Sequence, residues 1–205
     1  MNVNYSFQGT RVLVTGGTSG IGEAVAIAFA KAGADVVITG RDKTRGQAVL
    51  GAICDSGKDG TFIAGDLTDV TFCDSLVEQA YGVMGGLDVV VNCAGVIYHA
   101  DAVQTSDEQW HQTMNINVNA TFYVCRAALK LMTTQEDGGV ILNIASDAGL
   151  SASTGLTAYN ASKGAVIQMS RSMARDFGRH NIRVIPICPG DVDTPMLRGE
   201  FDQQG

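Results

Sequence analysis

The chain has 205 residues, of which 45% are hydrophobic and 17% charged, as is ordinary for one soluble globular domain. A formal net charge of −7 argues against a nucleic-acid partner or an anionic membrane surface, because both require a basic face. The five cysteines form no C-x-x-C pair and have no histidine at ligand spacing, which favours a reducing, cytoplasmic setting and disfavours a metal site. Residues 1–8 lack the apolar segment of a signal peptide, and no apolar run approaches the roughly 20 residues that span a bilayer.

Short apolar runs alternate with amphipathic stretches along the chain. Strands are predicted at residues 11–15, 35–39, 61–64, 88–91, 140–145 and 183–187, and helices at about 21–32, 42–54, 68–84, 106–132 and 157–177. Strands that are apolar on both faces and alternate with helices predict a parallel sheet covered on both sides. We therefore expect an α/β fold, a doubly wound parallel sheet of the Rossmann type in a single domain, with its ligand at the carboxyl ends of the strands. After residue 187 the tail is polar and carries no predicted element.

A glycine-rich loop, TGGTSGIG at residues 15–22, lies directly between the first strand and the first helix. Glycines there allow a sharp turn and let a pyrophosphate approach the helix N-terminus, where free N–H groups and the helix dipole favour an anion. The G-x-x-x-G-x-G spacing differs from the common dinucleotide fingerprint, so a tight turn for helix–strand packing is the alternative interpretation. The position of the loop after the first strand favours dinucleotide binding.

The end of the second predicted strand bears on the choice of cofactor. An acidic residue at this point would hold the ribose 2′-hydroxyl of NAD, whereas an arginine can clasp the 2′-phosphate of NADP. Gly40 offers no carboxylate and Arg41 follows it, so NADP(H) is favoured and NAD(H) is possible. The alternative is a solvated Arg41 that Asp42 neutralises.

Tyr159 and Lys163 are four positions apart on a predicted helix, so both side chains emerge on one face. A phenol with a pKa near 10 is a poor base at neutral pH, but an ammonium about 4 Å away favours the phenolate by roughly 4 kcal/mol before screening. That effect is large enough to bring the phenol toward pH 7, where acid–base catalysis is most effective. Taken alone, such a pair is usually only an exposed helix face.

Two further polar residues are candidates for the same chemistry. Ser146 ends the fifth predicted strand, where its hydroxyl could donate to a substrate oxygen or, alternatively, cap a turn. Asn117 lies in the middle of a predicted helix, where asparagine is a mediocre helix former. A functional reason for Asn117 is plausible, although a solvated asparagine is the more common case.

In order and spacing, the motifs from Thr15 to about Met196 resemble those of the short-chain dehydrogenases/reductases. They are TGGTSGIG at 15–22, NCAG at 92–95, Asn117, Ser146, the pair Tyr159 and Lys163, and Pro189-Gly190. The resemblance implies an NAD(P)-dependent oxidoreductase that moves a hydride between a nicotinamide and a carbonyl/secondary alcohol pair. It points to the ordinary oxidoreductase branch, with 3-oxoacyl-thioester reduction first and sugar, steroid or small alcohol oxidation as runner-up. The alternative is a redox-inactive regulatory or structural subunit on the same scaffold, which has no need of a proton-transfer group.

The resemblance also implies a role for each matching residue. Tyr159 would be the general acid in reduction and the base in oxidation, Ser146 would position the substrate oxygen, and Lys163 would also hold the nicotinamide ribose. Asn117 would anchor a water that relays protons. The cofactor would contact Gly16, Thr18, Ser19, Gly20, Ile21 and Gly22 around the diphosphate, Asp66 and Leu67 at the adenine, Asn92, Ala94 and Gly95 on the adenosine side, and Pro189, Gly190, Val192 and Thr194 at the nicotinamide. Asp66 could equally be only a helix cap, and Asn92 could also tie strands together.

Family members normally continue past residues 189–195 with a substrate loop, a further helix and a seventh strand. The resemblance therefore predicts that a C-terminal piece is missing from this sequence, and that activity is weak or absent if Gly205 is the true end. Met196, Leu197 and Phe201 suggest an apolar lid. A homo-oligomer, either dimer or tetramer, is expected to pack the two longest helices across symmetry axes, unless their apolar residues all face the sheet.

Overall fold

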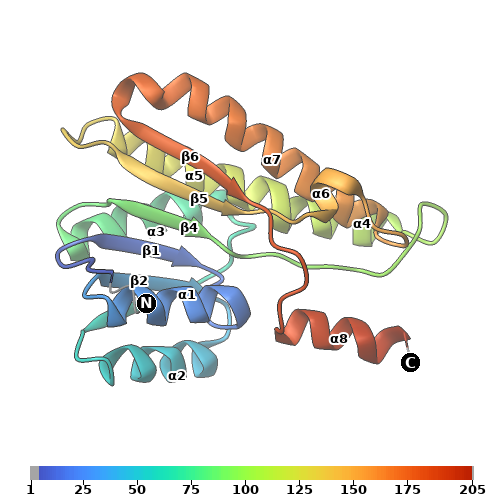
Figure 1. Ribbon diagram of the computed structural model, residues 1–205, viewed down its shortest axis with the longest axis horizontal. Helices are drawn as coiled ribbons and strands as arrows, with labels where there is room; N and C mark the ends of the chain where they lie inside the picture. Colours follow the sequence, from blue (N-terminus) through green and yellow to red (C-terminus); the bar gives the residue numbers. More distant parts are fainter. Residues whose placement is uncertain (1–4, 205) are drawn as a thin grey trace.

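The computed structural model describes the backbone of residues 5–204 and the side chains of residues 5–199. Six strands form one sheet in the order β3-β2-β1-β4-β5-β6, and every neighbouring pair is parallel (Figure 1). The strands are β1 Arg11–Thr15, β2 Asp35–Gly40, β3 Gly60–Ala64, β4 Val89–Asn92, β5 Gly139–Ile144 and β6 Ile182–Ile187. The order reverses direction between β1 and β4, which confirms the predicted doubly wound α/β fold of the Rossmann type.

Helices cover both faces of the sheet. They are α1 Gly20–Lys31, α2 Lys43–Cys54, α3 Val70–Met84, α4 Asp107–Thr113, the π-helical segment η1 Met114–Asn119, α5 Ala120–Met132, α6 Ala148–Ser151, α7 Thr157–Phe177, the 3-10 turn η2 Gly178–His180, and α8 Pro195–Gln204. None of the helices in the described part of the chain combines the length and apolar character that a bilayer crossing requires.

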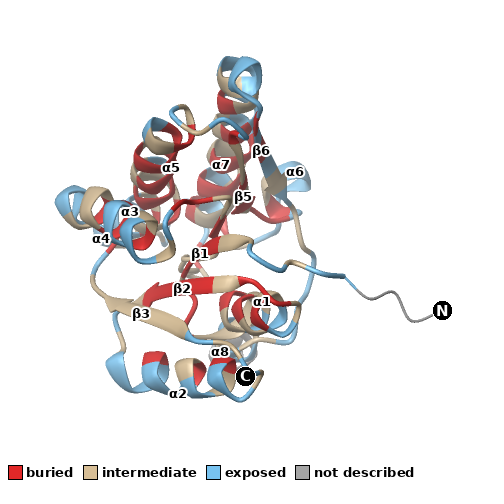
Figure 2. Cartoon of the chain, turned by 90° about the vertical axis from the view of Figure 1, so that its left-hand side faces the viewer, coloured by how far each residue is buried: buried red, intermediate tan, exposed pale blue. Residues whose placement is uncertain are grey.

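The alternation of side chains along each strand divides the core into two layers. Leu13 and Val90 belong to the layer that packs against α3, α5 and α7, whereas Val12 and Ile38 belong to the layer that packs against α1 and α2. Figure 2 shows buried residues in red along the central strands and on the helix faces turned toward them. Both faces of the sheet are therefore apolar, and the polar edge formed by the carboxyl ends of the strands is left for a ligand.

The structure corrects three parts of the sequence prediction. The helix predicted at 106–132 is interrupted by the π-helical segment η1, because a wider turn there admits an extra residue and directs Asn117 into the protein. The tail predicted to lack elements contains α8, whose start is marked by Pro195 and by the Thr194 hydroxyl, which accepts a hydrogen bond from the backbone N–H of Leu197. The short helix α6 also has no counterpart among the predicted elements.

Candidate active site

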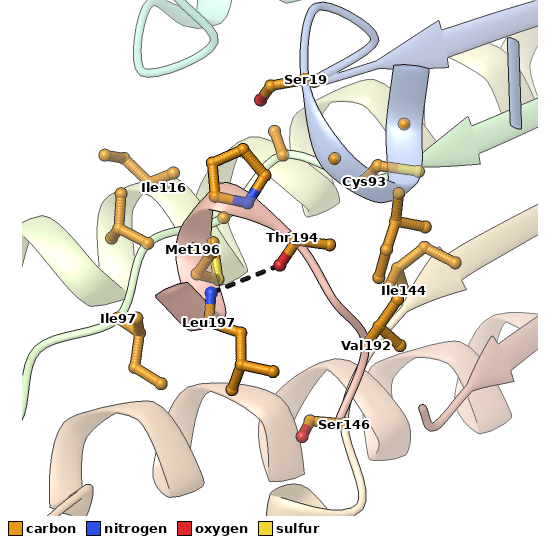
Figure 3. Close-up of a pocket in the computed structure, with 18 of the residues that line it drawn as sticks. Ser19, Cys93, Ile97, Ile116, Ile144, Ser146, Val192, Thr194, Met196 and Leu197 are labelled. Carbon is orange, nitrogen blue, oxygen red and sulfur yellow. Dashed lines mark hydrogen bonds between the residues drawn. The ribbon is translucent and has the colours of Figure 1, made fainter. Parts of the chain in front are cut away.

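A cleft of about 360 Å³ opens at the carboxyl ends of the strands. Its walls are the segments that directly follow β1 to β6, together with Tyr159 and Lys163 of α7 and the first residues of α8. Figure 3 shows part of this lining, including Ser19 of the glycine loop and Met196 and Leu197 of α8. These segments come from far apart in the sequence and meet because parallel strands all end at the same edge. The cleft lies where the doubly wound topology predicts a ligand site.

The glycine loop has no room for side chains at its tightest points. A Cβ on Gly22 would lie 2.3 Å from the carbonyl oxygen of Gly16, and one on Gly16 would lie 2.7 Å from the backbone nitrogen of Ala94. Gly16 also has a positive φ of 62°, which favours glycine. The side chain of Ser19 makes no capping hydrogen bond to α1, so the first-turn N–H groups face the cleft without that partner. The loop and helix end therefore fit the diphosphate of a dinucleotide.

We expect Gly22→Ala to weaken NADPH binding at least about tenfold and to lower the melting temperature, because a backbone contact of 2.3 Å forces the loop to move. The measurements are a fluorescence titration with NADPH and thermal unfolding. Gly51→Ala in α2 is the matched control, because a Cβ there meets nothing within 4 Å. Unchanged affinity and stability in Gly22→Ala would contradict the close approach.

At the end of β2, Asp42 does not neutralise Arg41. The Asp42 carboxylate caps α2 by accepting hydrogen bonds from the backbone N–H and the Nε of Arg45, at 3.0 and 2.8 Å, which lowers the pKa of Asp42. Arg41 is exposed and lines the cleft, as does Arg45. A Cβ on Gly40 would lie 2.7 Å from the side chain of Thr18, so a carboxylate at this position would require Thr18 to move.

Asp66 faces the same end of the cleft. Its carboxylate accepts hydrogen bonds from the backbone N–H and the hydroxyl of Thr68, both at 2.9 Å, and these bonds together with the nearby Arg41 lower the pKa of Asp66. The N-cap of α3 is Asp69, so Asp66 fixes the turn before the helix instead of capping it. The carboxylate is therefore held in place at the wall of the cleft.

Tyr159 and Lys163 come together on the cleft side of α7. The Nζ of Lys163 lies 5.5 Å from the centre of the Tyr159 ring and donates a 2.8 Å hydrogen bond to the carbonyl oxygen of Ile144. Lys163 is only 5% exposed, and this burial lowers the pKa of its ammonium from 10.5 to about 8. The lysine is thus mainly a cation at neutral pH, buried beside a half-buried phenol.

Ser146 follows β5 and faces the cleft (Figure 3). Its hydroxyl donates to the Asp147 carboxylate at 3.0 Å and accepts from the backbone N–H of Ala148 at 3.1 Å. The turn-capping role considered for Ser146 is therefore present. Because a hydroxyl rotates freely about its C–O bond, the same group can turn its proton toward a ligand oxygen.

Asn117 and Asn92 lie behind the wall of the cleft and do not line it. Both ends of the Asn117 amide are engaged: Oδ1 accepts from the backbone N–H of Val96 at 2.8 Å, and Nδ2 donates to the Val96 carbonyl and to the Ser162 hydroxyl. Asn92 accepts from the hydroxyl of Thr15 and donates to Asn143 at 2.9 Å. The first residue joins the loop after β4 to α7, and the second ties β1, β4 and β5 together.

A family model described as short chain dehydrogenase matches residues 10–205. The chain belongs to this family. It is 31% identical over 202 residues to the 2-dehydro-3-deoxy-D-gluconate 5-dehydrogenase of Dickeya dadantii, covering 97% of this chain and 79% of the relative. It is 40% identical over 186 residues to a 3beta-hydroxysteroid dehydrogenase of Mediterraneibacter gnavus, covering 90% and 67%. The crystal structure of a short chain dehydrogenase from Burkholderia cenocepacia in complex with NADP superposes with a TM-score of 0.87 at 34% identity, covering 93% of this chain and 77% of that one.

This short-chain dehydrogenase is therefore an NAD(P)-dependent oxidoreductase that acts on CH–OH groups, as the sequence predicts. Its cleft is lined by every residue that the sequence singled out for catalysis or cofactor binding except Asn92 and Asn117. The set includes six residues of the glycine loop, Arg41, and four residues that follow β6; the loop residues are Gly16, Thr18, Ser19, Gly20, Ile21 and Gly22, and the others are Pro189, Gly190, Val192 and Thr194. Local spacing was sufficient to find the glycine loop, Arg41 and the pair Tyr159 and Lys163, whereas the residues near the adenine and the nicotinamide were implied by the family resemblance.

Several lining residues of the short-chain dehydrogenase were missed. Arg45 follows Arg41 by four positions at the start of a predicted helix, and that spacing is the signal that could have revealed it. Ile97 and Ile116 carry no local signal, because a loop and the π-helical segment bring them to the cleft. Met196 and Leu197 line the cleft as a lid would, whereas the side chain of Phe201 lies outside the described residues.

Proposed function

We propose that this short-chain dehydrogenase interconverts a carbonyl compound and a secondary alcohol, with NADP(H) preferred to NAD(H). The observation that carries the proposal is the meeting of Tyr159, Lys163 and Ser146 in one cleft with Arg41. Arg41 and Ser146 follow β2 and β5, which are separated by β1 and β4, so the strand ends stand roughly 14 Å apart. A dinucleotide laid over the glycine loop between them would join the two ends. The direct test is a panel of ketones and secondary alcohols followed by nicotinamide absorbance.

The residues near Ser146 handle the proton of the reaction. In reduction the Tyr159 hydroxyl gives its proton to the substrate oxygen, and in oxidation the phenolate takes it back. The buried Lys163 cation favours the phenolate, because opposite charges attract strongly where water is excluded. The hydroxyl of Ser146 turns from Asp147 to the substrate oxygen and holds it. The nicotinamide supplies or accepts the hydride when it is bound.

Asn117 acts through other residues in this proposal. Its amide fixes Val96 and Ser162, so it sets the distance between the loop after β4 and the helix that carries Tyr159 and Lys163. A Cβ on Gly95 would lie 3.3 Å from Asn117 Oδ1 and 3.6 Å from Lys163 Nζ, which places the two side chains beside the same wall of the cleft. Asn117 is accordingly a positioning residue, and the water relay implied by the resemblance remains part of the proposal.

The preference for NADP(H) follows from Arg41 and Arg45. We expect Arg41→Ala to raise the Kd for NADPH about 10- to 100-fold and to leave the Kd for NADH nearly unchanged, because a charge-assisted contact to the 2′-phosphate is lost. Arg45→Ala should raise the Kd for NADPH by a smaller factor, since the guanidinium of Arg45 already forms an ion pair with Asp42. Arg171→Ala, an exposed arginine on α7 away from the cleft, is the control. Tighter binding of NADH than of NADPH by the unmodified protein would overturn the preference.

A homo-oligomer is also part of the proposal. On the outer side of α5 and α7, Phe122 is 38% exposed and Met169 is partly buried, whereas Leu129 and Met173 are core residues. Together with Phe177 they line an apolar hollow of about 510 Å³ that a second copy of the chain could cover.

The five cysteines are free, which supports the reducing, cytoplasmic compartment that we propose.

A further inference from the structure

The two ends of the cleft differ in their charged groups. The end near the glycine loop carries Arg41 and Arg45. Near Ser146 and Tyr159, by contrast, the wall is mostly apolar, and Figure 3 shows side chains from the loop after β4, the π-helical segment and α8 gathered around one hollow. These apolar lining residues are Val96, Ile97, Ile116, Leu156, Met196 and Leu197. A substrate here would therefore meet hydrocarbon over most of its surface.

Two carboxylates stand beside this apolar wall. Asp147 is the residue after Ser146, and its Oδ1 accepts hydrogen bonds from the Ser146 hydroxyl and from the backbone N–H of Ala148 at 2.7 Å. A Cβ on Gly190 would lie 3.6 Å from Asp147 Oδ2, so the carboxylate also reaches the segment after β6. Asp191 follows Gly190, is exposed, and lines the same cleft.

Among the described residues that line this end, Lys163 is the only cation. Its ammonium is buried and already donates to the Ile144 carbonyl beside the Tyr159 ring. An anionic group on the substrate would therefore face two carboxylates, with no exposed arginine or lysine in the described wall to receive it. Such a group would lose water without gaining a partner of opposite charge.

We infer, on the basis of the proposed function, that the substrate is an uncharged and largely apolar carbonyl compound or secondary alcohol, and that Asp147 and Asp191 select against a carboxylate or phosphate on it. The apolar wall supplies most of the binding through burial of hydrocarbon. The two aspartates supply the discrimination, because their negative charges repel an anionic substrate and leave the binding of an uncharged one unchanged.

The test uses a pair of substrates that differ only in charge, 4-hydroxycyclohexanecarboxylate and its methyl ester, together with the same pair built on a decalin ring. For the unmodified protein with NADP⁺, we expect kcat/KM for the ester to exceed that for the carboxylate by about tenfold or more. In the double variant Asp147→Asn with Asp191→Asn, the carboxylate-to-ester ratio of kcat/KM should rise about tenfold. Asparagine keeps an oxygen where Asp147 accepts its hydrogen bonds, so the local turn can be retained.

The control is Asp59→Asn, which removes one exposed carboxylate at the opposite edge of the sheet, next to the start of β3. It should leave the ratio unchanged. A second measurement needs no variant. Added salt should bring the kcat/KM values of the ester and the carboxylate closer together in the unmodified protein, because salt screens the repulsion between exposed charges. A preference for the carboxylate, or a ratio that neither the double variant nor salt alters, would overturn the inference. If neither these alcohols with NADP⁺ nor the corresponding ketones with NADPH were turned over, that result would instead contradict the proposed function.

Discussion

Tyr159→Phe should lower kcat by about 1,000-fold and leave the Kd for NADPH within about threefold of the original value. Removing the hydroxyl takes away the proton donor and acceptor, a loss of general acid–base catalysis that typically amounts to 10²–10⁴-fold. The ring remains, so its packing beside Lys163 at 5.5 Å is preserved. Turnover is followed by nicotinamide absorbance, and cofactor binding by fluorescence titration.

The matched control for this variant is Tyr98→Phe. The hydroxyl of Tyr98 donates to Gln112 at 2.8 Å and does not line the cleft, so its removal should leave turnover nearly unchanged. Undiminished turnover in Tyr159→Phe would refute the proposed mechanism. A large loss of NADPH affinity in the same variant would assign Tyr159 a mainly structural role.

Lys163→Met should move activity and stability in opposite directions. The pKa of about 8 means that burying the charged lysine costs roughly 3 kcal/mol at neutral pH, and methionine avoids this cost at similar length. Part of the gain, about 1 kcal/mol, is offset because the Ile144 carbonyl loses its donor. We expect the melting temperature to rise by several degrees while kcat falls about 100-fold or more.

The gain in stability should depend on pH in a definite direction. At a pH between the folded pKa of about 8 and the ordinary value of 10.5, Lys163 is mostly protonated in the unfolded chain and mostly deprotonated in the folded one. The free energy of unfolding of the original protein therefore rises relative to that of the variant as the pH increases through this window. Urea denaturation of both proteins at about pH 7 and pH 10 measures the change, with the exposed Lys43→Met as control. A stability difference independent of pH would contradict the buried charge.

How much of this site the sequence predicts depends on how local each feature is. The glycine loop and the pair Tyr159 and Lys163 are set by short spacings on a strand–loop–helix unit and on one helix, so reading the chain found them. The sequence did not predict that Asp42 pairs with Arg45 instead of Arg41, because both arginines are close to Asp42 along the chain. The pairing is set by the position at which α2 begins, since Asp42 is its N-cap. The hydrogen bond from Ser146 to Asp147 likewise depends on the short helix α6.

The long helix predicted at 106–132 shows the limit for the fold. Its apolar pattern continues through the region, so periodicity alone indicates an unbroken α-helix. The π-helical segment is favoured by contacts distant in sequence, since Asn117 bonds to Val96 and to Ser162. The prediction of a helix was right for most of residues 106–132, whereas the spacing of apolar residues gave no sign of the π-helical segment within it.

The inserted turn at Met114–Asn119 also constrains how this region can evolve. Because this turn holds one residue more than an α-helical turn, deleting a single residue there would close it to ordinary α-helix and leave α5 in register. Val124 and Ala128 would keep their places in the core layer, whereas the hydrogen bonds that join Asn117 to Val96 and Ser162 would be lost. A deletion within α5 itself would instead rotate the rest of that helix by about 100° and disturb the core, so the fold tolerates a change of length at the π-helical turn that the site does not.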